Sequence, residues 1–281
     1  MALPPDVLRC CLGYLDAGSL LACAAVCREW KASSLADDTW SCLYCREWRK
    51  GRPFPEGLQF DKNFTVLDMC KQRLKKDYTL STSCTQTEQP DKTILVQNNS
   101  SESESPFRNS VLSISSESPL RPVACFGACG RCLLYFEARI FGGASVGICC
   151  SPSKGVPNHY GAGNQNHVGW RGIGYGYHSD DGNFFWHERR GIFGGEWKSY
   201  GPSYGYKDRE RIHQIVGCGY DSDRQQIFFT LDGEWLGVAA SNIEQQDFHA
   251  AVGLHAPGDN VIINFGRSPF EFDIEAHCTA E

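Results

Sequence analysis

Apolar residues in the first 48 positions recur with the period of an α-helix. Val7, Leu8, Cys11, Leu12 and Leu15 are spaced by three and four residues, which places them on one face of a helix. Two prolines precede this face, at positions where the first turn of a helix tolerates proline. Because so small a segment cannot bury its apolar faces alone, we expect a partner or a neighbouring domain to cover them.

A second helix is predicted after the stretch Asp-Ala-Gly-Ser, which interrupts this pattern. Ser19 is a suitable N-cap, because a serine hydroxyl can accept a hydrogen bond from a free amide of the first turn. The helix would carry four apolar residues, Leu20, Leu21, Ala24 and Cys27. We expect Cys23 and Cys27, one helical turn apart, to pack on it as small apolar side chains.

Residues 49–90 change to a mixed, charged pattern that predicts a connecting extension followed by a flexible linker. The stretch FTVLDMCKQRLKK has the pattern of one further helix, whereas the residues after Leu80 are rich in Ser, Gln, Asn and Glu. Such polar composition rarely packs into a core. The stretch TILVQ indicates a first strand, so the next domain begins between residues 91 and 120.

From there to residue 275 the pattern predicts many short strands separated by Gly, Pro, Asn and Asp. In YFEARI, Phe136, Ala138 and Ile140 share one face of a strand. Asp232-Gly233 between two apolar runs predicts a hairpin, and Pro257-Gly258 predicts another of the same kind. The fold class is therefore mainly β: a C-terminal antiparallel β-sandwich, preceded by a small helical module over residues 1–48 and followed by a tail at 276–281.

Composition and charge restrict the cellular setting and the partners. The longest apolar run is well short of the ~20 residues of a membrane helix, and the first residues lack the pattern of a signal peptide. The 15 cysteines are odd in number and often adjacent, which favours a reduced environment. We expect an intracellular protein, cytoplasmic or nuclear. Since the net charge is −6 and no segment concentrates basic residues, we expect neither nucleic acid nor a membrane as a partner.

Chemical sites are weakly indicated. The stretch GASVG matches the G-x-S-x-G pattern of serine hydrolases, but the β-branched run after Ser145 does not predict the helix which that motif requires. We expect its glycines to form a hairpin instead. Asp180 and Asp181 precede a glycine, as is typical of a turn that needs no ligand.

Zinc sites could be built from two Cys-x-x-Cys pairs, Cys42 with Cys45 and Cys129 with Cys132, or from Cys23 with Cys27. None of these pairs has a second pair at a usual spacing, and a structural zinc site needs four ligands. We therefore expect no enzyme activity, no metal and no cofactor.

The N-terminal segment resembles an F-box. The resemblance rests on Leu3-Pro4, the apolar face of the first helix, the Leu-Asp before the second, the run Val26-Cys27-Arg28-x-Trp30 and the later Trp40. An F-box implies docking onto the adaptor subunit of cullin–RING ubiquitin ligases. The contact residues carried over from the motif are Leu3, Pro4, Leu8, Val26 and Trp30.

The C-terminal region resembles a SPRY domain, most closely those of the Ran-binding protein M type. The stretches YFEARI, VGIC, GYGYHSDDG, GCGYDSDRQQIFFTLDGEWLG and AVGLHAPGDNVIINFG occur in family order. A SPRY domain implies a bent β-sandwich whose loops bind a peptide or protein.

The loop residues implied by this resemblance are Pro122, Val123, Ala124, Tyr160 and His255. The first three match a Pro-Val-Ala loop of SPRY domains that are attached to SOCS boxes. The arginine which that group places before the proline is replaced here by Leu120, with Arg121 adjacent.

Together the two resemblances imply a substrate-recognition adaptor of an SCF-type ubiquitin ligase, with the cullin complex at one end and a target protein at the other. The alternative is a ligase-independent SPRY scaffold that binds peptides or proteins while its N-terminal helices only pack on the sandwich.

Overall fold

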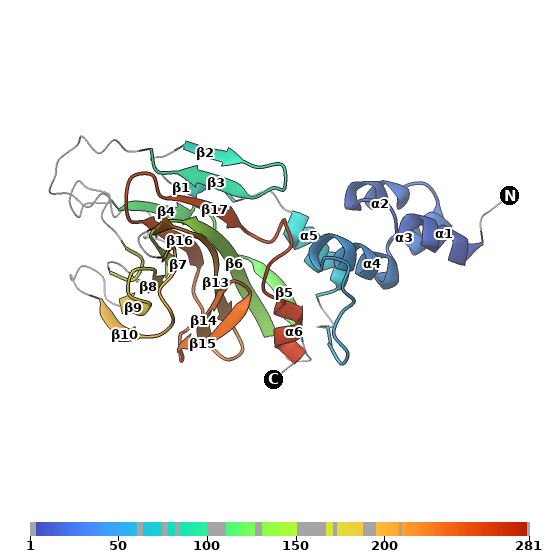
Figure 1. Ribbon diagram of the computed structural model, residues 1–281. Coiled ribbons are helices and arrows are strands. Elements are labelled where there is room, and N and C mark those ends of the chain that lie inside the picture. The colour runs from blue at the N-terminus through green and yellow to red at the C-terminus, as the bar shows by residue number, and fades with distance from the viewer. Residues whose placement is uncertain are drawn as a thin grey trace.

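A computed structural model describes residues 4–60, 64–74, 78–81, 85–99, 111–126, 131–150, 167–170, 173–187, 195–207 and 210–279. At 5, 6, 81, 124–126, 131 and 211 only the backbone is described. Five helices at the N-terminal end extend away from two packed β-sheets (Figure 1). A short C-terminal helix lies near the place where these helices meet the sheets (Figure 1).

The N-terminal helices form a small module with its own core. They are α1 (Pro5–Leu12), α2 (Ala17–Cys23), α3 (Arg28–Ser34), α4 (Asp37–Trp48) and α5 (Val66–Leu74). Their core is built from Leu8, Leu12, Leu20, Trp40, Leu43, Tyr44, Val66, Met69 and Cys70. The predicted helix in FTVLDMCKQRLKK is thus confirmed as α5, and its apolar side chains complete the core of the module.

The second helix begins differently from the prediction. Asp16, not Ser19, is the N-cap of α2, because its carboxylate accepts hydrogen bonds from the backbone amide and the hydroxyl of Ser19. The helix ends at Cys23, which packs at the edge of the core. Cys27 is the N-cap of α3 and is exposed, so the expectation that it packs on the second helix is wrong.

The sandwich consists of two antiparallel sheets. Sheet A contains, in spatial order, β15 (Glu234–Ala240), β14 (Gln226–Leu231), β13 (His213–Asp221), β6 (Arg131–Phe141), β17 (Asn260–Asn264), β3 (Ile94–Gln97) and β2 (Thr85–Glu88), and β5 (Pro122–Phe126) also pairs with β6. Sheet B contains β1 (Leu80–Ser81), β4 (Leu112–Ser116), β16 (Phe248–Leu254), β7 (Ala144–Cys150), β8 (Gly174–His178), β9 (Asn183–His187) and β10 (Glu196–Ser199). A short pair, β11 (Tyr206–Lys207) and β12 (Glu210–Arg211), lies outside both sheets.

The main core lies between the two sheets. Phe136, Ala138 and Ile140 on β6 are fully buried in it, as their shared face predicts. The opposite face of β6 has a second, smaller core, because Tyr135 packs there against Phe270 and Phe272. After these residues the chain forms α6 (Ile274–Thr279), which overlaps the predicted tail.

Two of the four predicted turns join adjacent strands of one sheet. Asp232 and Gly233 both have positive φ, +50° and +83°, and connect the paired strands β14 and β15. Gly182, with φ +68°, follows the two aspartates in the turn between β8 and β9. Both predictions are confirmed.

The other two predicted hairpins are wrong. The Pro257-Gly258 turn leads from β16 in sheet B to β17 in sheet A, and the glycines before Ser145 lead from β6 in sheet A to β7 in sheet B. Each turn therefore carries the chain from one layer of the sandwich to the other. The local turn residues are the same as in a hairpin, but the strands that follow find their partners elsewhere.

Residues 49–90, predicted as an extension and a linker, contain α5 and two short strands, β1 and β2. β2 pairs with β3 at the edge of sheet A, and β1 pairs with β4 at the edge of sheet B. Among the described residues, no helix is both long and apolar enough to cross a membrane.

Candidate functional site

The predicted F-box contacts divide into buried and exposed residues. Leu8 is 4% exposed and belongs to the core of the module, and Trp30 is half-buried against that core. Pro4 is exposed at the N-cap of α1, and Val26 is 62% exposed after α2. Leu3 lies outside the described residues. Of the four described residues, Pro4 and Val26 are thus the exposed ones, and a contact role for all five residues stays a prediction.

Four large apolar side chains in the described part of residues 1–49 are exposed: Val7 (46%), Tyr14 (81%), Leu21 (44%) and Val26 (62%). We call them the N-terminal apolar set. The apolar face of α1 is wider than the core can cover: Leu8 and Leu12 point inward and Val7 remains outside. Burying such side chains against a partner is favourable, at about 25 cal/mol per Å² of apolar surface.

The predicted SPRY loop Pro122–Ala124 is a strand in the structure. It forms β5, in which Pro122 lies opposite Leu134 of β6. Val123 is buried in the small core with Tyr135 and Phe272, so its side chain is not available to a ligand. Pro122 is half-buried, and the side chain of Ala124 is not described.

His255 lies at the other end of β6. Its backbone amide donates to the carbonyl of Gly143, just after the last residue of that strand. From Leu134 to Phe141 an extended strand spans roughly 23 Å at ~3.3 Å per residue. The structure therefore does not bring His255 and the Pro-Val-Ala strand together. Tyr160 lies outside the described residues.

His255 belongs to a cluster of three histidines. The ring centroids of His167 and His255 are 4.4 Å apart, and those of His167 and His178 are 5.3 Å apart. Burial lowers the pKa of His178 to about 4, although its hydrogen bond with the carbonyl of Val168 acts in the opposite direction. Burial, together with the two other imidazoles, lowers the pKa of His167 to about 3. Burial also lowers the pKa of His255. All three imidazoles are therefore neutral at pH 7.

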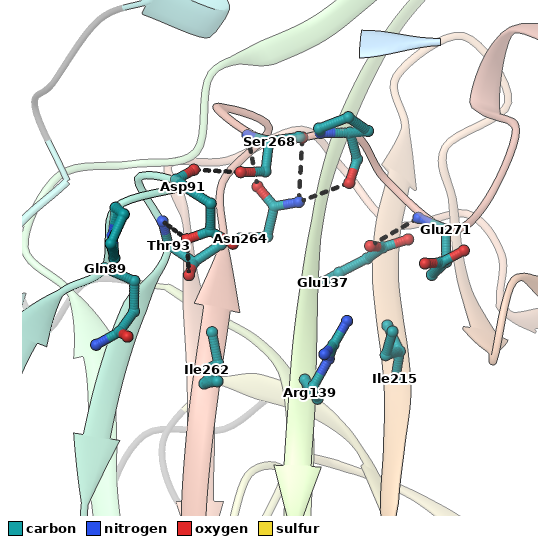
Figure 2. A pocket seen from close by; sticks show the side chains of 12 residues that line it. Gln89, Asp91, Thr93, Glu137, Arg139, Ile215, Ile262, Asn264, Ser268 and Glu271 are labelled. Carbon is teal, nitrogen blue, oxygen red and sulfur yellow. Dashed lines mark hydrogen bonds between the residues drawn. The ribbon is translucent and has the colours of Figure 1, made fainter. Parts of the chain in front are cut away.

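Figure 2 shows a pocket of about 320 Å³ on the outer face of sheet A. Its floor is a row of side chains from three paired strands, Ile215, Arg139 and Ile262. Its rim is formed by the β2–β3 turn around Asp91 and by the segment after β17 around Ser268. The Ser268 hydroxyl donates to the backbone carbonyl of Asp91, so the rim is closed by the chain's own hydrogen bond.

Glu137 in this pocket holds the C-terminal segment on the sheet. One carboxylate oxygen accepts from the Phe272 amide at 3.0 Å, and the other accepts from the Glu271 amide at 3.0 Å. Burial raises the pKa of Glu137, and these two amides oppose that effect. Because its lone pairs are used in this way, we interpret Glu137 as a structural residue.

A buried group of charges joins the helical module to the C-terminal segment. Arg49, at the end of α4, forms ion pairs with Asp273 at 2.8 Å and with Glu275 at 2.5 Å. The Tyr44 hydroxyl donates to Glu275 at 2.6 Å, and Arg73 of α5 lies 3.5 Å from the same carboxylate. We call these five residues the joint.

The joint is packed as well as paired. The Arg73 guanidinium lies 4.7 Å from the ring centroid of Phe270 and 5.1 Å from that of Tyr44, so it lies between the two parts of the molecule. The Trp48 indole donates to the carbonyl of Arg267, and Cys278 of α6 contacts both the module's core and the small core on sheet A. These contacts fix the helical module relative to the sandwich.

The structure does not give Ser145 the surroundings of a nucleophile. It lies within β7, fully buried, and its hydroxyl accepts a hydrogen bond from the Val168 amide. Cys42 and Cys45 lie on α4, and Cys129 is outside the described residues. In the described part of the chain, no three His, Cys, Asp or Glu side chains are arranged to hold a metal ion.

Sequence reasoning did not identify three features. Tyr14 and Leu21 were not expected on the surface, although the apolar positions of α1 and α2 exceed what one helix face can bury. The joint could not be expected, because Arg49 and Glu275 are 226 residues apart and no local pattern links them. The clustering of His167 with His178 and His255 depends on the same kind of long-range approach.

Family models match two parts of the chain. Residues 1–49 match the F-box-like model, and residues 133–268 match the SPRY domain model. The first match covers α1 to α4, and the second runs from β6 to the segment after β17. The module with the exposed apolar set and the sandwich with the histidine cluster thus correspond to separate domains.

Three known proteins are similar to parts of the chain. The chain is 43% identical over 107 residues to the dual specificity protein kinase splA of Dictyostelium discoideum, which covers 38% of this chain and 4% of that protein. It is 34% identical over 155 residues to Ran-binding protein 9 of Xenopus laevis, which covers 53% of this chain and 24% of that protein. The chain therefore spans only a small part of these relatives. A crystal structure of a human SPRY domain, 23% identical, covers 64% of this chain and 94% of that chain with a TM-score of 0.41.

Proposed function

We propose that this protein is a substrate-recognition adaptor of an SCF-type ubiquitin ligase. It contains an F-box-like domain at residues 1–49 and a SPRY domain at residues 133–268 that is homologous to those of Ran-binding proteins 9 and 10. The F-box-like domain suggests binding of the ligase adaptor subunit, and the SPRY domain suggests binding of a target protein. The proposed partners are that adaptor subunit with its cullin on one side and one target protein on the other.

The observation that carries this proposal is the N-terminal apolar set. Val7 lies on α1 and Leu21 on α2, and Tyr14 and Val26 lie in the turns that follow these two helices. This end of the helical module is the part farthest from the sandwich (Figure 1). Nothing in the described part of the chain covers these side chains, whereas a docked adaptor subunit would bury them. Exposed apolar side chains that gather into a patch are typical of interaction surfaces, and these four all belong to the first 26 residues of the small helical module.

The mechanism is proximity. Holding a target near the charged ubiquitin carrier converts a bimolecular encounter into an effectively intramolecular one and raises the local concentration of target lysines. The joint supports this role, because a fixed module transmits a defined orientation from the ligase to the bound target.

The test is co-purification of the full chain with the ligase adaptor subunit and cullin. Leu21→Asp and Val26→Asp each place a charge in the proposed interface without touching the core, so we expect each to reduce recovery of the adaptor at least about tenfold. Val238→Asp is the matched control, because Val238 is 37% exposed but lies on β15 of the sandwich. Leu8→Asp is unsuitable, since a buried charge would unfold the module.

The second candidate is a ligase-independent SPRY scaffold. It is favoured by the joint, because the helical module packs on the C-terminal segment of the sandwich and could serve only to stabilise it. If the wild-type chain never recovers the adaptor or cullin, this alternative replaces the ligase proposal.

A further inference from the structure

Aromatic rings gather on the outer face of sheet B. Trp197 on β10 is 60% exposed, and Trp170 in the segment before β8 is 41% exposed. Trp197 lies directly opposite Phe185 of β9. The neighbouring position on β9, Phe184, is in the main core. Because side chains alternate along a strand, Phe185 and Trp197 point away from that core.

These rings form one continuous ridge. Phe185 is 6.4 Å from Trp197, 6.0 Å from Trp170 and 4.2 Å from His178, measured between ring centroids. Trp170 is in turn 4.3 Å from His167. We call Trp170, Phe185, Trp197, His167 and His178 the aromatic ridge.

Glycines allow the chain to build this ridge. A side chain at Gly176 would come within 2.4 Å of the carbonyl oxygen of Val168, and one at Gly169 would come within 2.3 Å of that of Phe185. Gly169 also has a φ of +89°. The segment that carries His167 and Trp170 can therefore lie directly on the sheet only because both positions lack a Cβ.

The ridge also holds uncharged polar atoms without a partner. The Nδ1 atom of His167 and the Nε2 atom of the adjacent His255 are buried and make no hydrogen bond with the described residues. Buried polar atoms are normally bonded, so these two nitrogens are exceptions among the described residues.

Among the described residues, acidic side chains lie beside the ridge. Asp180 and Asp181 are exposed, and both are close enough to act on the pKa of His167 and of His255. The nearby Lys198 does not balance them, because its ammonium lies 5.8 Å from the ring of Phe184. A partner with positive charges next to its apolar part would complement this surface.

We propose that the aromatic ridge binds an extended, proline-containing peptide segment flanked by basic residues. Proline rings pack flat on exposed aromatic rings, and a polyproline II segment is already extended, with free carbonyl groups along its length. One part of the inference rests on the proposed function, namely that this peptide belongs to the target protein.

The experiment uses the full chain and a labelled peptide of eight prolines with two arginines at each end. Fluorescence anisotropy measures its binding. We expect Trp197→Ala to weaken binding about tenfold or more, since a tryptophan in a binding surface commonly contributes that much. Trp235→Ala is the matched control: Trp235 is 42% exposed but lies on β15 of sheet A, and its loss should leave binding unchanged.

Two further probes test the parts of the proposal. A peptide with glycines in place of the prolines should bind at least about tenfold more weakly, and one with glutamates in place of the arginines should also bind more weakly. Equal binding of the proline and glycine peptides, or equal binding by the wild type and Trp197→Ala, would overturn the proposal. So would a self-association that Trp197→Ala abolishes while the wild type binds no peptide, because the occupant would then be a second copy of the chain.

The result can be separated from that of the proposed function. The peptide assay contains no ligase component, and Val26→Asp should leave peptide binding unchanged. Conversely, Trp197→Ala should leave recovery of the ligase adaptor unchanged.

Discussion

Individual residues of this protein take their properties from burial more than from their type. His167 and His213 are both histidines, but His213 is exposed on β13 whereas His167 is half-buried beside two other imidazoles. Leu8 and Val7 are neighbours on α1, but one is 4% and the other 46% exposed. The same side chain can therefore serve the core or a partner, depending on which way the helix faces.

His167 makes stability depend on pH. Burial, followed by the nearby His255 and His178, lowers its pKa to about 3, whereas an unfolded histidine titrates near ~6.5. Between these two pKa values the unfolded chain binds more protons at this histidine than the folded chain does. The contribution of His167 to stability is therefore full above pH ~6.5 and is lost as the pH falls toward 3. Asp180 and Asp181 oppose this effect without reversing it.

We expect His167→Gln to reduce the acid sensitivity of folding. Between pH 6.5 and 5 its free energy of unfolding should fall by about 1 to 2 kcal/mol less than that of the wild type. Urea unfolding at each pH measures this difference. His213→Gln, at an exposed position, should behave as the wild type, and an unchanged slope for His167→Gln would contradict the argument.

At the scale of elements, local turn signals predict that the chain turns but not which strand it joins. Asp232-Gly233 makes a hairpin within sheet A, whereas Pro257-Gly258 carries the chain from one sheet to the other. The difference arises from the strands on either side: β17 pairs with β6 and β3, which lie in the layer opposite β16. Strand pairing over long sequence distances outweighs the turn.

The hairpin at Gly233 provides a test at this scale. Its φ of +83° is strained for any residue with a Cβ, and an added Cβ would also lie 3.2 Å from the carbonyl oxygen of Glu271. Gly233→Ala should lower the free energy of unfolding by about 1 to 2 kcal/mol. Gly13→Ala is the control, because Gly13 has a φ of −60° and a Cβ added there would lie no closer than 3.5 Å to any neighbouring atom. Thermal unfolding that shifts equally for both variants would contradict the prediction.

The whole molecule depends on the joint between its two domains. Arg49 has a side chain only 3% exposed, and Glu275 only 5%. Such a pair is costly to break, since loss of one partner leaves a buried charge without compensation. For Asp273, burial alone would raise the pKa, but the hydrogen bonds and charge of Arg49 lower it overall.

Arg49→Met should therefore destabilise the protein by about 3 to 5 kcal/mol. Arg52→Met is the matched control: Arg52 pairs with Asp273 at 3.1 Å, but its side chain is 48% exposed, so the loss should stay below about 1 kcal/mol. Chemical unfolding followed by tryptophan fluorescence measures both. Similar losses for the two variants would show that the joint contributes no more than a surface ion pair.

Local patterns in the sequence were sufficient to predict most of the elements and the two domain families. Apolar spacing predicted the helices and the β-sandwich, and short motifs predicted the F-box-like and SPRY resemblances, because helix and strand periods and turn residues are local properties. Asp232-Gly233 and the buried face of YFEARI belong to this class.

Which residues meet depends on the tertiary structure. It joined Arg49 to Glu275, gathered His167, His178 and His255, and placed Pro122 and His255 at opposite ends of β6. It also left Val26 exposed while it buried Leu8. These outcomes depend on contacts between residues far apart in the chain, and burial, pairing and pKa follow from such contacts rather than from any pattern in the neighbouring sequence.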